Sequence, residues 1–396
     1  MKPIHLKTTA FALALAASPL AMGQHKVLGG FAYGKQEAPT GKEWESVEEL
    51  SLNKEYPRAY FFSFADEASA TKVLPEHSSY WLSLNGDWQF HWSKTPDGRV
   101  KDFFKPDYNA SAWDKLAVPS SWNVAGIQKN GSLKYGLPIY VNQKVIFQHK
   151  IVKDDWRGGV MREPPKTWTT YEYRNEVGQY RRTFEIPASW DGREVFIDFD
   201  GVDSFFYLWI NGQYVGFSKN SRNTASFDIS RYLKKGTNTV AVEVYRNSDG
   251  SFLEAQDMFR LPGIFRTVAL RSTPKLQIYN LNVQGELSVS TGGASSSIEG
   301  GKEDLPSGEI VLNATLRNLT PKQAKQLHLN YKVYKCELYS DTVKEVAELK
   351  GSATVAVAAP NALTQSHLKI PAKNIKAWSA EEPHRYVLVA QLTDKK

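Results

Sequence analysis

The chain has 396 residues, of which 41% are hydrophobic and 23% are charged. That length and balance exclude a disordered chain and allow two or three domains with sizeable cores. The formal net charge is +7, but Lys and Arg are scattered among 42 acidic residues and form no basic helix or RNA-binding signature. We therefore expect a solvated basic surface and no nucleic-acid partner. Cys336 is the only cysteine, which excludes an intrachain disulfide.

The amino terminus has the pattern of a secretory signal. Lys2 and Lys7 precede an apolar run at residues 10–17. The small residues Ala21 and Gly23 follow at a spacing that a signal peptidase accepts. The apolar run is too short to span a bilayer. We expect removal of the signal peptide, residues 1–23, export to the periplasm of a Gram-negative bacterium, and no membrane attachment of the mature protein.

The first part of the mature chain is expected to be an arm followed by a buried strand. Residues 24–80 lack a clean period, which predicts an extended arm laid over the first domain. The Asn-Gly pair at residues 85–86 then predicts a turn that feeds a half-buried strand. Trp88, Phe90 and Trp92 fall on one face of that strand, and core packing explains them without a ligand.

The strongest β signals fall before residue 246. Runs typical of strands occur at residues 178–184, 195–199, 205–210, 213–217 and 239–245. Asn211-Gly212 separates two of these runs, which predicts a tight hairpin. Helical periodicity is nearly absent. We therefore predict an all-β fold that opens with a jelly-roll β-sandwich, which with its arm occupies residues 24–272.

A second β unit is expected over residues 273–396. Its predicted strands lie at residues 276–283, 309–316, 328–334, 352–357, 367–370 and 386–392, and a Ser- and Gly-rich tract at 288–301 predicts a loop. By strand count and turn spacing the unit resembles an immunoglobulin-like β-sandwich, incomplete at its carboxyl end. Trp378 is expected to plug its core beside a turn at Pro383.

Residues 246–266 carry the most candidate functional side chains. This stretch has too many turn formers for a strand or a helix and too many aromatic residues for a disordered linker. It predicts an ordered loop that presents acidic and amide side chains at a surface, Asp257 among them. A loop with only a structural role is the alternative.

Seven segments resemble, in order and approximate spacing, the amino-terminal domain of family 2 glycoside hydrolases, the group of the bacterial β-galactosidases (lactases). They are residues 83–88, 118–122, 138–142, 200–202, 208–212, 215–216 and 246–266. The resemblance implies a jelly roll of the galactose-binding-like type. It also implies retaining hydrolysis of terminal non-reducing β-D-galactose residues. β-Glucuronidases and β-mannosidases share this fold, so another sugar specificity is an alternative.

In that family a (β/α)8 barrel follows the second unit and carries the acid/base Glu and the nucleophile Glu. No barrel sequence follows within these 396 residues. The resemblance therefore implies the amino-terminal portion of a longer enzyme, with no catalytic residue in this chain and no activity of its own. A noncatalytic carbohydrate- or partner-binding protein is the alternative.

The resemblance also assigns two substrate-binding residues. Asp257 corresponds to a carboxylate that accepts a hydrogen bond from a galactose hydroxyl and helps to ligate a monovalent cation, usually sodium. Asn142 corresponds to an amide that hydrogen-bonds the sugar. An ionised carboxylate only accepts hydrogen bonds, which suits both partners of Asp257. Asp249 and Glu254 are expected to brace the loop.

The ligand and assembly expectations follow from the same resemblance. The expected partner is a β-galactoside carbohydrate, and the full-length protein is a candidate homo-oligomer. The family uses magnesium and sodium ions, whereas no cofactor is expected to bind within this chain alone. The roles of Arg246 and Asn247 stay open at this point.

Overall fold

The structure is a computed structural model that describes residues 26–28, 31–34, 36–47, 49–140, 175–254, 256–288, 307–324, 326–356, 359–373 and 375–394. The predicted signal, Asn142 and most of the Ser- and Gly-rich tract lie outside these ranges. Within them the sheets are built almost entirely of antiparallel strands, so the prediction of a mostly β protein is confirmed. No helix in the described ranges combines the length and the apolar character needed to cross a bilayer.

The first part of the chain supplies a nine-stranded sheet with the order β1-β2-β3-β12-β11-β14-β8-β5-β6, and a four-stranded sheet with the order β13-β9-β17-β4. The strands of the larger sheet are β1 (Lys26–Leu28), β2 (Phe31–Tyr33), β3 (Ser51–Leu52), β5 (Gly86–Ser93), β6 (Asp114–Val118), β8 (Val177–Glu185), β11 (Phe205–Ile210), β12 (Gln213–Lys219) and β14 (Thr237–Tyr245). Those of the smaller sheet are β4 (Trp81–Ser83), β9 (Glu194–Phe199), β13 (Ala225–Asp228) and β17 (Val268–Thr273).

The main core lies between these two sheets, and β11 shows why. Alternate residues of a strand point to opposite faces, yet every residue of β11 is buried. Phe206 packs toward the smaller sheet, with its ring 4.9 Å from that of Phe199. Trp209 points to the opposite face, where Phe104 stacks on it at 5.0 Å. The larger sheet is therefore covered on both faces, on one side by the smaller sheet and on the other by connecting segments.

Two local predictions in this region are confirmed. β11 and β12 pair as an antiparallel hairpin across Asn211 and Gly212. Their φ angles are 51° and 80°, and a two-residue turn with positive φ at both positions favours an Asn-Gly pair. Trp88 and Phe90 of β5 are fully buried in the main core, and Trp92 packs against it.

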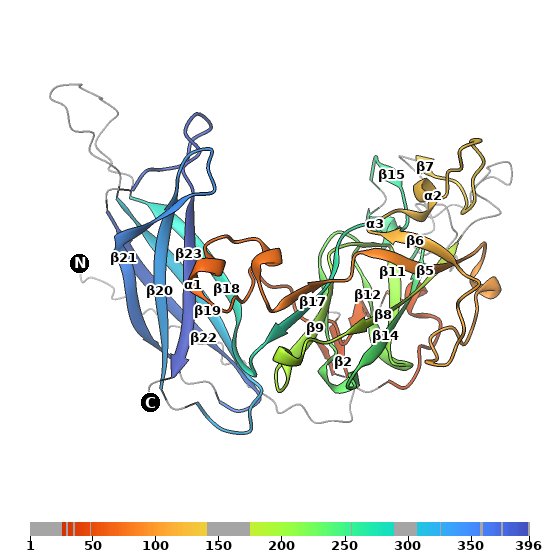
Figure 1. Ribbon diagram of the computed structural model, residues 1–396, viewed down its shortest axis with the longest axis horizontal. Helices are drawn as coiled ribbons and strands as arrows, with labels where there is room; N and C mark the ends of the chain where they lie inside the picture. The colour runs from red at the N-terminus through yellow and green to blue at the C-terminus, as the bar shows by residue number, and fades with distance from the viewer. Residues whose placement is uncertain are drawn as a thin grey trace, which may run out of the picture.

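The predicted arm covers the first sheet over only part of its length. β3 pairs with β12 and so adds the arm to the edge of the nine-stranded sheet. The next residues lie against the second unit instead, where Glu55 is 2.7 Å from Arg317 and Glu67 of helix α1 (Glu67–Ala70) is 2.7 Å from Lys332. Figure 1 shows this segment, in orange, against the strands of that unit. The arm thus joins the two units.

The second unit consists of two three-stranded sheets, β18-β19-β22 and β21-β20-β23, and lies to one side of the first (Figure 1). Its strands are β18 (Leu276–Leu287), β19 (Gly308–Asn318), β20 (Leu327–Cys336), β21 (Val343–Val355), β22 (Ala362–Ala372) and β23 (Tyr386–Asp394). Buried side chains such as Leu316 of β19 and Leu329 of β20 form a shared core. The expected strands are therefore present, although β21 is longer than its sequence signal.

One expectation for this unit is wrong. Trp378 does not plug a core, because its side chain is 66% exposed. A β-bridge joins Trp378 to Pro383, and the backbone N–H of Ser379 donates to the carbonyl of Glu382. This small hairpin holds the indole ring on the outside of the unit.

The stretch 246–266 contains more regular structure than a loop. It includes helix α3 (Ser251–Glu254) and strands β15 (Phe259–Arg260) and β16 (Gly263–Ile264). The short strands form because distant segments pair with them, β7 (Ile139–Tyr140) with β15 and β10 (Val202–Asp203) with β16.

The remaining short elements are α2 (Trp122–Ala125) and the 3-10 turns η1 (Glu43–Glu45), η2 (Pro75–His77), η3 (Pro96–Gly98), η5 (Ala188–Trp190) and η6 (Ser230–Tyr232). In Figure 1, α2, α3, β7 and β15 gather at one end of the first unit.

Candidate functional site

Asp257 is exposed on the connection between α3 and β15. The hydroxyl of Tyr140 donates a hydrogen bond to its Oδ1 atom. β7 and β15 pair antiparallel and place Phe259 opposite Tyr140, with the two rings 5.4 Å apart. The two segments from which Asp257 and Asn142 were predicted are thus neighbours in space. Asn142 itself follows β7 outside the described residues.

The surface around Asp257 is unusually apolar. Tyr140 is 53% exposed and Phe259 is 61% exposed. The neighbouring helix α3 adds Leu253, which is 82% exposed. Flat rings beside a carboxylate combine an apolar contact surface with a hydrogen-bond acceptor. That combination suits a ligand with both hydroxyl groups and C–H faces.

A buried ion pair holds the β7–β15 ribbon from behind. Nη1 of Arg246 lies 2.7 Å from Oε1 of Glu176, and both side chains are almost completely buried. Nη2 of the same guanidinium donates to the carbonyl of Leu137 at 3.0 Å and to that of Arg260 at 3.5 Å. Leu137 precedes β7 and Arg260 belongs to β15. One arginine therefore ties both strands of the ribbon to the interior.

The Glu176 carboxylate also organises the segment around α2. It accepts hydrogen bonds from the indole N–H of Trp122 at 3.1 Å and from the amide of Asn123 at 3.4 Å. The chain passes this carboxylate at Gly136, where φ is +73° and a Cβ atom would overlap Glu176. Only glycine satisfies both conditions. The path of the chain into β7 is thus set by close packing on a buried charge.

Two acids of the loop are braces, as predicted. Asp249 Oδ1 lies 2.8 Å from the ammonium of Lys219, and both side chains are buried. Glu254 accepts from the backbone N–H and the hydroxyl of Ser221, each at 2.6 Å. Lys219 ends β12 and Ser221 follows shortly after it, so both braces connect the loop to the same hairpin strand.

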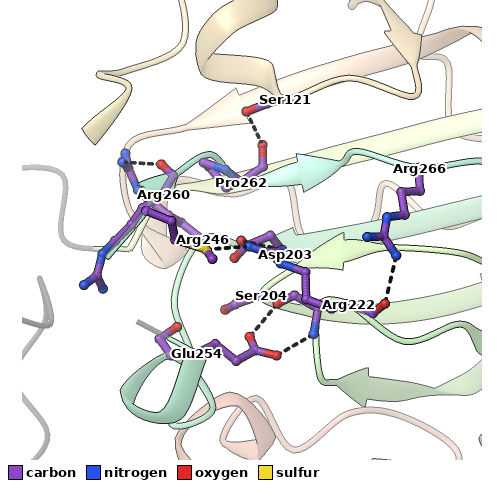
Figure 2. A network of polar contacts seen from close by, with 12 residues as sticks. Ser121, Asp203, Ser204, Arg222, Arg246, Glu254, Arg260, Pro262 and Arg266 are labelled. Carbon is purple, nitrogen blue, oxygen red and sulfur yellow. Dashed lines mark hydrogen bonds and ion pairs between the residues drawn. The ribbon is translucent and has the colours of Figure 1, made fainter. Parts of the chain in front are cut away.

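A small pocket lies between the loop and β10. Its lining includes Asp203, Arg222, Arg246, Glu254 and Met258, and Arg222 and Arg246 lie around Asp203 (Figure 2). Arg222 is 3.3 Å from Asp203 and reaches the sulfur of Met258 at 3.4 Å. The cavity volume of about 20 Å³ accommodates about one water molecule. A sugar ring therefore has no room in this pocket.

Asp203 is expected to make stability pH-dependent. Burial raises the pKa of Asp203 from its usual range to about 6, against the opposing effect of Arg222. The folded protein thus keeps a proton that the unfolded chain releases. The contribution of Asp203 to the free energy of unfolding should fall by roughly 3 kcal/mol as pH rises from about 3 to about 7, and Asp203→Asn should remove that fall. Urea unfolding across this pH range measures it.

Asp114 supplies the control for this prediction. A hydrogen bond from Lys134 lowers the pKa of Asp114. The contribution of Asp114 to the free energy of unfolding is therefore lost as pH decreases, not as pH rises. The difference between wild type and Asp114→Asn should therefore have the opposite pH dependence. Identical pH profiles for wild type and Asp203→Asn would contradict the assignment.

The described residues offer little for a metal ion. They contain no group of three or more His, Cys, Asp or Glu side chains that could hold one. The exposed Asp257 carboxylate is the kind of oxygen ligand that hard cations bind.

Comparisons with known proteins identify the family. Residues 81–274 match the family described as glycosyl hydrolases family 2, sugar binding domain. A β-galactosidase of Priestia megaterium is 37% identical over 352 residues, which are 88% of this chain and 30% of that protein. The chain belongs to glycoside hydrolase family 2. It corresponds to the amino-terminal part of the family's longer members, and its sugar-binding domain implies a carbohydrate ligand.

Two further similarities agree with this assignment. A β-galactosidase of Halalkalibacterium halodurans is 32% identical over 313 residues, which cover 79% of this family 2 chain and 26% of the relative. The crystal structure of a Bacteroides uniformis β-glucuronidase has a TM-score of 0.55 at 17% identity, with 80% of this chain and 30% of that chain covered. The structural likeness shows a shared fold. The chain thus spans under a third of the length of each of these proteins.

Sequence reasoning missed the buried residues behind the site. Glu176, Asp203 and Arg222 were not singled out, and the role of Arg246 was open. A Glu two residues before a predicted strand has no local signal of burial. The best available signal was Arg246 at the end of a strongly apolar strand, because a charge in that position needs a buried partner.

Proposed function

We propose that this chain is the sugar-binding portion of an exported, retaining β-galactosidase. Asp257 contacts a hydroxyl of the terminal galactose, and the catalytic barrel lies elsewhere in a longer protein. The observation that carries the proposal is the exposed Asp257 carboxylate beside Tyr140, on a ribbon held by the buried Arg246–Glu176 pair. The curated relatives named as β-galactosidases support galactose as the sugar.

The proposal includes a domain assignment. Residues 1–23 form a cleaved signal peptide, residues 24–272 a jelly-roll sugar-binding domain with its arm, and residues 273–396 an immunoglobulin-like domain. Separate pairs of facing sheets before and after residue 274 support the two domains.

The apolar surface near Asp257 would face the rest of the longer protein. Val124 of α2 and Ile127, which follows α2, are 48% and 49% exposed, and they add to the exposed rings of Tyr140 and Phe259. Large apolar side chains exposed at one end of a domain are typical of a surface that another part of the protein covers. The chain spans 30% of the length of the Priestia relative, which leaves ample protein to cover it.

Two finer assignments remain part of this proposal. Asp257 supplies one carboxylate ligand to a sodium ion that also touches the bound galactose, and Asn142 hydrogen-bonds the same sugar. A single carboxylate that serves a hydroxyl and a cation together couples sugar affinity to the cation. Self-association of the full-length protein is proposed with them.

Relative turnover of three substrates tests the function. The full-length protein should hydrolyse a nitrophenyl β-galactoside with a kcat/KM at least ~10-fold above those for the β-glucuronide and the β-mannoside, because sugar hydroxyl contacts each contribute about 1–3 kcal/mol. If the protein preferred the β-glucuronide or the β-mannoside, that sugar would replace galactose in the proposed specificity. Galactoside binding without turnover would favour a noncatalytic carbohydrate-binding protein, for which the exposed rings of Tyr140 and Phe259 also provide a surface.

A further inference from the structure

The amino-terminal arm contacts the ligand loop, defined as residues 246–260. The backbone N–H of Asp249 donates to the carbonyl of Trp44 at 2.9 Å. The Trp44 ring stacks on Tyr245, with centroids 5.7 Å apart and planes at 18°. Tyr245 is the residue directly before the loop. The arm therefore touches the loop at its start, through both backbone and ring.

Lys219 joins the arm and the loop through one buried ammonium. It forms the 2.8 Å ion pair with Asp249 and also donates to the carbonyl of Ser46 in the arm. Its side chain is 2% exposed and that of Asp249 is 8% exposed. Water therefore screens this contact little, and displacement of the arm would remove an acceptor from a buried cation.

Lys54, farther along the arm, places a second positive charge near the loop. The residue is 4% exposed and forms a β-bridge with Phe227. Burial lowers the pKa of Lys54 to about 8, while the negative charge of Glu254 in the loop acts in the opposite direction. A buried ammonium opposes folding unless its partners compensate. A methionine would fill similar space in this core without a buried charge.

We propose that Trp44, Ser46 and Lys54 are positioning residues that hold the ligand loop, and with it the Asp257 carboxylate, in place. This inference rests on the proposed contact of Asp257 with sugar. The arm contacts the loop at Asp249, directly before α3, and carries the buried Lys54 charge, on which the charge of Glu254 at the end of α3 acts. Loss of the arm contacts should loosen the loop while the two facing sheets stay folded.

Hydrogen–deuterium exchange on the 396-residue chain at pH 7 tests the inference. In Lys54→Met, peptides that cover the ligand loop should exchange at least ~10-fold faster, while the urea midpoint stays equal to that of wild type or rises. Lys134→Met is the control, because Lys134 is an exposed lysine paired to an acid outside the loop. It should change neither quantity.

A double-mutant cycle separates positioning from general destabilisation. Lys54→Met and Glu254→Gln should each speed exchange of the loop, and the double variant should be no faster than the faster single variant. If the rate increases of the two single variants multiply in the double variant, Lys54 and Glu254 act independently, and the coupling between them is overturned. Unchanged loop exchange in Lys54→Met, or faster exchange across the whole chain with a lower urea midpoint, would overturn the positioning role.

The proposed function and this inference fail in distinguishable ways. If Asp257→Ala in the full-length protein leaves galactoside KM unchanged, the sugar contact is wrong, yet the exchange result still decides whether the arm holds the loop. If Asp257→Ala raises KM and Lys54→Met leaves both KM and loop exchange unaltered, the sugar contact stands and the arm has no positioning role.

Discussion

Replacing Glu176 with Gln is expected to lower the free energy of unfolding by about 3–5 kcal/mol, because it leaves the Arg246 guanidinium buried without its counter-charge. The fully buried carboxylate also accepts from the indole N–H of Trp122 and the amide of Asn123. A Gln side chain presents an NH₂ group where the carboxylate presents an oxygen, so at least one of the buried donors around it loses its acceptor. Urea unfolding of the purified chain measures the loss.

Glu185→Gln is the matched control for this change. Glu185 is an exposed residue of β8 that accepts from the hydroxyl of Thr237 at 2.9 Å. Its replacement should alter stability by less than ~0.5 kcal/mol, as surface substitutions usually do. If Glu176→Gln is as mild as this control, the buried pair does not hold the β7–β15 ribbon.

Replacing Asp257 with Ala is expected to raise the KM of the full-length protein for a galactoside and to lower kcat. One lost hydrogen bond to a charged acceptor costs roughly 1–3 kcal/mol, which corresponds to about a 5- to 150-fold loss in kcat/KM. Because Asp257 is exposed, the urea midpoint should stay close to that of wild type. Steady-state kinetics at fixed sodium concentration, together with unfolding curves, check both expectations.

Asp191→Ala provides the comparison, since Asp191 is also exposed but follows η5 in a different connection. It should leave kcat and KM unaltered. Kinetics of Asp257→Ala that match those of Asp191→Ala would remove Asp257 from the binding site. A fall in kcat/KM accompanied by a large loss of stability would mean that the residue supports the loop rather than the ligand.

The strands of this protein were predictable because their signals are local. β11 and β12 show apolar runs of strand-forming residues around an Asn-Gly pair, and neither signal depends on the rest of the chain. The acidic loop was predictable for the same reason, from turn formers mixed with aromatic residues between residues 246 and 266. Even so, the helix α3 and the strand β15 inside it were missed. A two-residue strand such as β15 exists only where a distant partner pairs with it.

The arrangement behind Asp257 depended on contacts between residues far apart in the chain. Nothing near Glu176 in the sequence indicates that it pairs with Arg246, nor does anything near Lys219 indicate Asp249. Whether a charge is solvated or buried depends on what the fold packs around it, and that is a property of nonlocal strand pairing. Residue patterns were therefore enough for a mostly β chain with an exposed acidic loop, whereas the buried ion pairs that hold this loop emerged only when distant strands came together.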